Sequence, residues 1–164
     1  MILQRKLKVD TMDFDYILID CPPSIGLFTI NAFVAVQEVF VPILPDYFSL
    51  DGFGNLCETI ETVAELLNPQ LQLSGVIVNQ FNTQTRLALE VINEIQLFVE
   101  KARKQGKQSI CQNAKVFETK IRRNIRLAEA PSFGQSIFDY DANSNGAEDY
   151  CNLAREIMAQ VKAP

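Results

Sequence analysis

The chain alternates between two patterns of hydrophobic and polar positions, one typical of buried strands and one typical of amphipathic helices. Four apolar runs rich in β-branched and aromatic residues predict strands, and continuous runs of this kind are typical of parallel strands buried on both faces. Pro42 lies inside the second run. Because proline cannot donate a ladder hydrogen bond, it indicates an edge strand or a strand end. The predicted strands cover residues 16–19, 39–45, 73–79 and 116–121.

Apolar residues at helical spacing predict four helices between and after these runs. We expect them at about residues 25–36, after a loop at 46–50 until Asn68-Pro69, after residue 83, and from residue 145 to the end. Residues 1–12 are expected to form a short helix or a frayed leader. The expected caps are Ser49 or Asp51 for the second helix, Thr83 for the third, and a capping box of Asn145 with Glu148 for the last.

Strands that alternate with helices predict an α/β protein with a mainly parallel sheet flanked by helices. The chain has 164 residues without internal repeats or a linker, so we expect a single domain over residues 1–164. No apolar stretch is long enough to cross a membrane. The basic residues near the N-terminus are not followed by the apolar region of a signal peptide. We therefore expect a cytoplasmic protein.

The cysteine and histidine content excludes two classes of site. The chain has four widely spaced cysteines, no Cys-x-x-Cys pair and no histidine. A zinc site of the usual kind would need paired ligands, and a Ser-His-Asp or Cys-His nucleophile would need a histidine. We expect Cys21, Cys57, Cys111 and Cys151 to be core or neutral residues of a reduced protein.

The charge is unevenly distributed. The net charge is −5, but residues 101–126 carry nine basic residues and one acid, a local charge of +8 against −13 for the rest. A basic zone on an acidic protein indicates a directed anionic partner, while a solvated charged face remains the alternative. The basic residues are Lys101, Arg103, Lys104, Lys107, Lys115, Lys120, Arg122, Arg123 and Arg126.

One carboxylate stands where α/β proteins bind ligands. Asp20 follows the apolar run at residues 16–19 and precedes two prolines. In open α/β sheets, ligands bind beyond the carboxyl ends of the strands. An aspartate there can hold a hydrated Mg²⁺ near the phosphates of a nucleotide. The alternative is that Asp20 only opens a turn.

Four segments together carry a resemblance to one protein family. Residues 14–27, Phe-Asp-Tyr-Ile-Leu-Ile-Asp-Cys-Pro-Pro-Ser-Ile-Gly-Leu, resemble the Walker B and switch II segment of the ParA/MinD family of deviant-Walker ATPases. Residues 123–134, Arg-Asn-Ile-Arg-Leu-Ala-Glu-Ala-Pro-Ser-Phe-Gly, are similar to a signature of its ParA/Soj partitioning branch. Residues 47–52 and 140–150 also match in order and spacing, so the resemblance runs from residue 14 to the end.

For nucleotide, the resemblance implies a P-loop NTPase (SIMIBI-like) fold with ATP and Mg²⁺ as ligands. Asp20 would orient Mg²⁺ through water as the catalytic carboxylate. Asn79 would lie near the adenine, or it would satisfy backbone groups in its own turn. Pro131 would pack against the base. The switch that responds to the γ-phosphate would comprise Cys21, Pro22, Pro23 and Ser24.

For partners, the resemblance implies a homodimer that forms with ATP, non-specific DNA, a ParB-like protein and a nucleoid-associated location. Arg122, Arg123 and Arg126 would bind DNA, which agrees with the local positive charge because phosphate contacts need cations and no base readout. The alternative is that these arginines lie in a solvated connection.

The chain departs from the family at the phosphate-binding loop. No Lys-Gly-Gly-x-x-Lys-Thr motif occurs, and Gly106-Lys107 is followed by glutamine where Mg²⁺ binding requires serine or threonine. The chain resembles the later two-thirds of a ParA-type domain without the first βα unit. The family places the P-loop strand beside residues 16–20, so we expect a defect in the sheet between that segment and residues 39–44, with marginal stability.

The sequence therefore predicts part of a ParA-like partitioning ATPase that does not hydrolyse ATP by itself. A stand-alone DNA- or partner-binding module without catalysis is the alternative. A related synthetase of the amidotransferase type is a third possibility, against which the Arg-Asn-x-Arg-Leu stretch argues.

Overall fold

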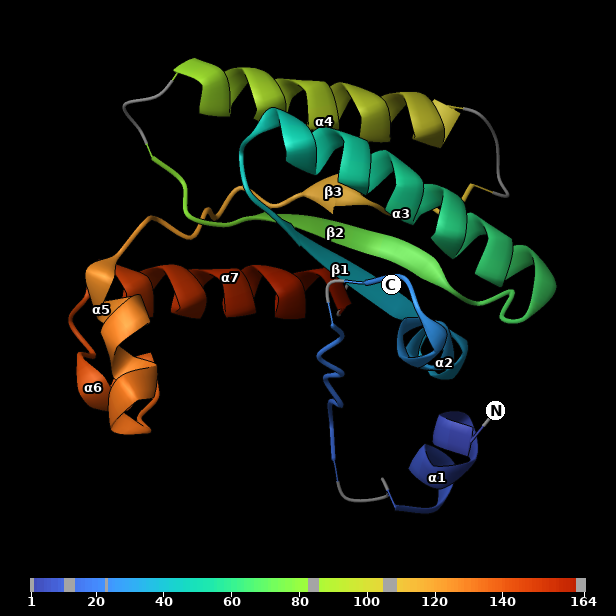
Figure 1. Ribbon diagram of the computed structural model, residues 1–164, viewed down its shortest axis with the longest axis horizontal. Coiled ribbons are helices and arrows are strands. Elements are labelled where there is room, and N and C mark those ends of the chain that lie inside the picture. Colours follow the sequence, from blue (N-terminus) through green and yellow to red (C-terminus); the bar gives the residue numbers. More distant parts are fainter. Residues whose placement is uncertain (1, 11–13, 23, 83–85, 105–108, 162–164) are drawn as a thin grey trace.

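The computed structural model describes residues 2–10, 14–22, 24–82, 86–104 and 109–161. Three parallel strands form a sheet in the order β1-β2-β3. Helices α3 and α4 cover one face and helix α7 covers the other (Figure 1). The fold is thus α/β with a parallel sheet, as expected. The strands are β1 (Glu38–Ile43), β2 (Gln72–Val78) and β3 (Lys115–Val116); the helices are α1 (Ile2–Asp10), α2 (Leu27–Ala35), α3 (Tyr47–Leu66), α4 (Arg86–Lys104), α5 (Ile125–Glu129), the 3-10 turn η1 (Ala130–Phe133), α6 (Ile137–Tyr140) and α7 (Asn145–Val161).

The hydrophobic core lies on both faces of the sheet. Ile60 of α3, Leu73 of β2 and Ile95 of α4 belong to one cluster and are fully buried. On the opposite face, Phe117 packs in a second cluster with α7, and its ring stacks on Phe40 with centroids 6.0 Å apart. The two layers of helices therefore hold the sheet between them.

Strand β1 is an edge strand, as Pro42 predicts. The N–H of Asn79 donates to the carbonyl of Ile43 at 2.8 Å, so Ile43 faces β2. Neighbouring residues of a parallel strand direct their backbone groups to opposite sides, and Pro42 therefore turns its missing N–H toward the open edge. Among the described residues β1 pairs only with β2. The open edge expected beside residues 39–44 is present, but the strand expected across it from residues 16–20 is not.

The predicted strand at residues 16–19 is wrong. The described residues 14–22 contain no strand, and the side chains of Tyr16 and Leu18 are 51% and 89% exposed. Figure 1 shows this segment, in blue, running away from β1 toward α1. Strand backbone groups need a neighbouring ladder, and the described residues place none beside this segment. The apolar side chains of Tyr16, Ile17 and Leu18 therefore remain exposed to solvent.

Helix α3 begins earlier than predicted. Asp46, not Ser49 or Asp51, is its N-cap, because the Asp46 side chain accepts the N–H of Ser49 at 2.8 Å. The predicted loop at residues 46–50 consequently forms the first turn of α3. The predicted cap Thr83 of α4 lies outside the described residues.

The fourth predicted strand is much shorter than expected. Only Lys115–Val116 pairs as a strand, although the N–H groups of Phe117 and Ile121 still donate to β2, to the carbonyls of Val76 at 3.0 Å and Val78 at 2.9 Å. The N–H groups of Glu118 and Thr119 donate to the carboxylate of Glu156 on α7, both at 3.0 Å. A side chain on α7 thus interrupts the pairing with β2 between Phe117 and Ile121.

The predicted capping box of the last helix is also wrong. The hydroxyl of Ser144 accepts the N–H of Ala147 at 3.2 Å, so Ser144 caps α7. Asn145 is the first residue of the helix. No helix in the described part of the chain is long and apolar enough to cross a membrane.

Candidate functional site

The carboxyl ends of the strands bring two of the predicted polar segments together. Asn79 follows β2 and is bonded through its N–H to Ile43 at the end of β1. Two residues after Asn79, the N–H of Phe81 donates to the carbonyl of Ile121 at 2.9 Å, and Phe81 forms an isolated parallel bridge with Arg122. The Asn79 turn and the arginine segment therefore lie at the same edge of the sheet, with α5 and α6 beyond it (Figure 1).

The Asp20 segment is not joined to this edge by any interaction of the described residues. Asp20 is exposed on irregular backbone. Burial raises the pKa of the Cys21 thiol, and the nearby Asp20 carboxylate raises it further. Pro22 is exposed and Pro23 lies outside the described residues. In the part of the chain that the structure describes, no group of three or more histidine, cysteine or acidic residues is arranged to hold a metal ion.

The segment after Asp20 is nevertheless tied to the rest of the fold at the start of α2. The hydroxyl of Thr29 donates to the carbonyl of Ser24 at 2.7 Å, and Thr29 is buried. The N-cap of α2 is Gly26, which has extended backbone and offers no capping side chain. This helix end has neither the glycine-rich loop nor the lysine that hold nucleotide phosphates in P-loop proteins.

Asn79 supports the turn that follows β2. Its side-chain oxygen accepts the N–H of Gln80 at 2.8 Å, and Gln80 has a left-handed backbone with φ of 51°. A left-handed conformation is unfavourable for glutamine, so this hydrogen bond helps to hold it. The turn role of Asn79 is visible here, and its contact with adenine stays a prediction.

The Arg-Asn-x-Arg-Leu stretch folds as a capped turn of helix rather than as a simple connection. The side chain of Asn124 accepts the N–H of Arg126 at 2.8 Å and caps α5. Helix α5 continues into η1, in which Ala130 is buried and Pro131 is exposed. Gly134 ends the turn with φ of 64°, a conformation that glycine adopts without strain. The base contact predicted for Pro131 stays a prediction.

Arg122 is held by two carboxylates of α7. Its guanidinium donates to both oxygens of Asp149, at 2.7 Å and 3.0 Å, and to Glu148 at 2.7 Å. Its backbone N–H also donates to Asp149 at 2.9 Å. The hydrogen bonds to Asp149, then to Glu148, raise the pKa of the guanidinium. Asp149 is 5% exposed, so the Arg122–Asp149 pair fastens the arginine segment to α7.

The side chains of Arg123 and Arg126 are more exposed to solvent than that of Arg122. Arg126 pairs with Glu129 at 3.0 Å and with Asp141 at 3.5 Å, while half of its side chain remains exposed. Its hydrogen bond with Glu129 is the main cause that raises its guanidinium pKa. Arg123 is exposed, and no carboxylate in the described part of the chain forms an ion pair with it. The DNA-binding role of the three arginines stays a prediction.

Sequence reasoning missed the acidic partners of these arginines. Asp149 received no role, and Glu148 was assigned to a capping box instead of to Arg122. One signal was available: Asp149 precedes Leu153 by four residues, so the two share one face of the last helix, and both are buried. A carboxylate in such a position requires a partner.

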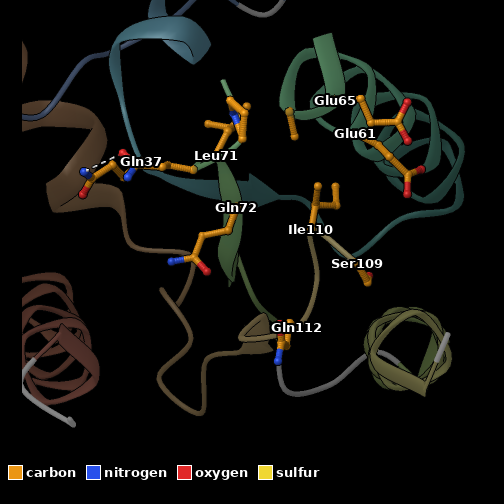
Figure 2. A pocket seen from close by; sticks show the side chains of 11 residues that line it. Gln37, Glu61, Glu65, Leu71, Gln72, Ser109, Ile110 and Gln112 are labelled. Carbon is orange, nitrogen blue, oxygen red and sulfur yellow. Dashed lines mark hydrogen bonds between the residues drawn. The ribbon is translucent and has the colours of Figure 1, made fainter. Parts of the chain in front are cut away.

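A hollow lies at the opposite end of the sheet. It has a volume of about 790 Å³, and Gln37 and Gln72, at the amino ends of β1 and β2, line it together with Glu61 and Glu65 (Figure 2). Its carboxylates repel phosphate. A smaller hollow of about 250 Å³ lies between the end of β1 and the first half of α3, with mostly apolar walls. Neither hollow offers cations for a nucleotide.

Comparisons with known proteins give the family. The chain is 40% identical over 157 residues to the sporulation initiation inhibitor protein Soj of Bacillus subtilis. The aligned region covers 96% of this chain and 57% of Soj. It is 38% identical to the chromosome partitioning protein ParA of Myxococcus xanthus over 95% of the chain and 50% of that protein. The AAA_31 family model, an AAA domain, matches residues 1–73.

Solved structures give the same fold. The cobyrinic acid a,c-diamide synthase of Mycobacterium smegmatis with bound ATP analogue and magnesium matches with a TM-score of 0.72 and 26% identity, over 98% of this chain and 54% of the synthase. The same enzyme with bound ADP and magnesium matches with a TM-score of 0.70. The fold is therefore that of a P-loop ATPase, represented here by part of its elements.

The chain spans about half the length of the curated relatives that it matches, from 50% to 57% of those named above. The two alignments nevertheless cover 96% and 95% of this chain. The chain belongs to the ParA/Soj branch of the ParA/MinD family of deviant-Walker ATPases.

Proposed function

We propose that this chain is the C-terminal part of a ParA-like partitioning ATPase that acts in chromosome or plasmid segregation. The observation that carries the proposal is the 40% identity with Soj of Bacillus subtilis across 96% of the chain. In the complete protein we expect ATP-dependent dimerisation on DNA, release when a ParB-like partner stimulates hydrolysis, and a cytoplasmic, nucleoid-associated location.

The charge and exposure of the arginine segment support contact with DNA. Arg123 offers an exposed cation for a phosphate group. Arg126 shares its charge with Glu129 and Asp141, so a phosphate must compete with those carboxylates. Arg122 is already balanced by Asp149 and mainly positions its neighbours. We assign the direct phosphate contacts to Arg123 and Arg126, without base readout.

The described residues do not fit a phosphate site. In P-loop proteins, backbone N–H groups, the helix dipole and a lysine neutralise the phosphates. Here the exposed carboxylate of Asp20 repels phosphate unless Mg²⁺ intervenes, and Asn79 and Pro131 provide at most a surface for the base. We propose that residues 1–164 alone bind MgATP no more tightly than millimolar, about −4 kcal/mol, and do not hydrolyse it. The nucleotide and magnesium bound by the synthase support their use in the complete fold.

Charge reversal tests the DNA surface. Fluorescence anisotropy of a labelled duplex of random sequence at low salt would measure affinity for wild type, for the double variant R123E/R126E, and for R5E. We expect the double variant to lose about tenfold or more in affinity. Arg5 lies on α1, away from α5 and α6 in Figure 1, so R5E is the control for a charge reversal elsewhere on the chain. Equal affinity of wild type and the double variant would contradict the assignment.

A second candidate is a stand-alone DNA- or partner-binding module derived from such an ATPase. The absence of a Lys-Gly-Gly-x-x-Lys-Thr motif from the 164 residues favours it. The coding sequence upstream of residue 1 separates the two candidates, since a P-loop encoded there in frame would support the ATPase. Synthetase chemistry is less supported, because identity to the synthase is 25–26% and identity to the partitioning proteins reaches 40%.

A further inference from the structure

Strand β1 has one free edge. The carbonyls of Gln37 and Ile43 both accept N–H groups from the β2 side, so the odd-numbered residues of β1 face that strand. Phe40 and Pro42 therefore direct their backbone groups to the other side, where no strand of the described residues pairs with them. Pro42 has no N–H, but its carbonyl and both backbone groups of Phe40 can bond a further strand. Such an edge is a template for pairing with another chain.

An apolar hollow of about 250 Å³ lies beside this edge. Val41, Pro42 and Ile43 line it from β1, and Gly52 and Phe53 line it from α3. A methyl group added to Gly52 would meet no atom of the described residues within 4 Å, so the α3 wall is open there. A cavity of about 150 Å³ holds a benzene molecule. This hollow can therefore receive a branched aliphatic side chain from a strand added at the edge.

The same chain carries an unpaired segment that suits the edge. Residues 14–20, which we call the arm, contain the strand-forming run from Tyr16 to Ile19. The side chains of Phe14, Ile17 and Leu18 are exposed, and the described residues place no strand beside them. Contiguous exposed apolar side chains mark an interaction site. The chain thus presents both an open edge and a strand-forming segment without a ladder.

The arm is held outside its own sheet at both ends. Helix α1 precedes the arm and packs against α2. After the arm, the hydroxyl of the buried Thr29 of α2 donates to the carbonyl of Ser24 at 2.7 Å. Between these two attachments the arm runs away from its own β1 (Figure 1). Because its ends are fixed, few residues lose conformational freedom when the arm pairs with another molecule.

We propose that the arm of a second copy of this chain adds residues 16–19 to the open edge of β1, with one of its aliphatic side chains in the apolar hollow. The arm of the first copy pairs in the same way with β1 of the second, so the exchange closes a two-fold symmetric dimer. Asp15 and Asp20 flank the run and stay in water. They restrict the register, because a slip of one residue turns every side chain to the other face. This dimer requires no nucleotide and is separate from the ATP-dependent dimer of the proposed function.

Filling the hollow tests the interface. Analytical ultracentrifugation over a concentration series, without nucleotide or DNA, would measure the dimer Kd of wild type, G52L and G54L. In G52L the added side chain occupies the hollow, and we expect dimerisation to weaken about tenfold or more. G54L is the matched control, because Gly54 also lies on α3 with open space around its Cβ position but does not line the hollow. A wild-type chain that stays monomeric at every concentration, or equal weakening by both variants, would overturn the proposal.

Cross-linking locates the arm. In C21S/C151S/L18C/P42C, one introduced thiol lies on the arm and one on the open edge, while Cys57 and Cys111 are buried. Equal amounts of ¹⁴N- and ¹⁵N-labelled chains are mixed, treated with a short bismaleimide and digested. We expect linked peptides that join one light and one heavy segment. Linked peptides of a single label only would show that the arm closes on its own β1, and this result or the absence of any link would contradict the exchange. Circular dichroism confirms that the variant is folded.

Discussion

The Arg122–Asp149 pair allows a quantitative test of how the arginine segment is held. In the variant D149A, the backbone N–H of Arg122 loses its acceptor and the guanidinium loses its bidentate partner. An unsatisfied backbone group costs about 1–3 kcal/mol, and a hydrogen bond to a charged group contributes about 1.5–3 kcal/mol. The Arg122 side chain is 38% exposed and keeps Glu148, so water and that carboxylate recover part of the loss.

We therefore expect D149A to lower the free energy of unfolding by about 2–4 kcal/mol. For a chain of this size that corresponds to a fall in Tm of about 4–16 °C. The variant E148A is the matched control, because it removes a neighbouring carboxylate that pairs with the same guanidinium but is 64% exposed. Its cost should stay below about 1 kcal/mol.

Urea denaturation followed by circular dichroism measures both variants at neutral pH and moderate salt. A loss of less than about 1 kcal/mol in D149A, equal to that in E148A, would refute the reasoning, because buried and exposed partners would then contribute alike. The conservative variant D149N keeps one acceptor oxygen, and we expect its loss to lie between those of wild type and D149A.

Three further predictions follow from other contacts. G75A should cost about 1–3 kcal/mol in urea denaturation, because the added Cβ would overlap the buried ring of Phe117. Burial favours the neutral form of Glu156, but the N–H groups of Glu118 and Thr119 outweigh this and lower its pKa. E156Q should therefore destabilise by about 1 kcal/mol at pH 7. The difference should begin to shrink below the ordinary glutamate pKa of about 4.3 and disappear below the lowered pKa of Glu156. Calorimetry should show no saturable micromolar binding of MgATP, whereas a micromolar Kd that disappears in D20A would reveal a phosphate site.

The helices α2, α3, α4 and α7 and two of the strands could be predicted because their patterns repeat over many residues, whereas the short helices α5 and α6 were missed. Stripes such as Val91, Ile95 and Ala88 on α4 are buried as their spacing predicts. Pro42 indicated an edge strand or a strand end, because the missing N–H of proline is tolerated only where no neighbour needs it; among the described residues β1 is an edge strand, and Pro42 lies one residue before its end.

The predicted strand at residues 16–19 failed because strand formation depends on a partner that the local sequence does not encode. The run is apolar and rich in strand-forming residues, yet Leu18 is 89% exposed. The strand predicted over residues 116–121 is interrupted because Glu156 from α7 accepts the N–H groups of Glu118 and Thr119, while Phe117 and Ile121 on either side still donate to β2. Both errors concern contacts between residues distant in sequence.

The candidate site was predicted from resemblance, and the structure adds the partners of its side chains. Charge counting treated Arg122, Arg123 and Arg126 alike, but their carboxylate partners differ in number and burial. Only the folded chain brings Asp149 to Arg122 and Glu156 to the N–H groups of Glu118 and Thr119. Such pairs join separate elements, so spacing along the chain could not have identified them.

The measurement that tests the central claim most directly is the salt dependence of DNA binding by the wild-type chain, with and without MgATP. The account predicts weak binding through Arg123 and Arg126, so log K should fall with log salt with a slope of about −2. Addition of MgATP should leave both the affinity and the slope unchanged, because the described residues build no phosphate site. Absence of binding at low salt, or tighter binding only with MgATP, would contradict the account.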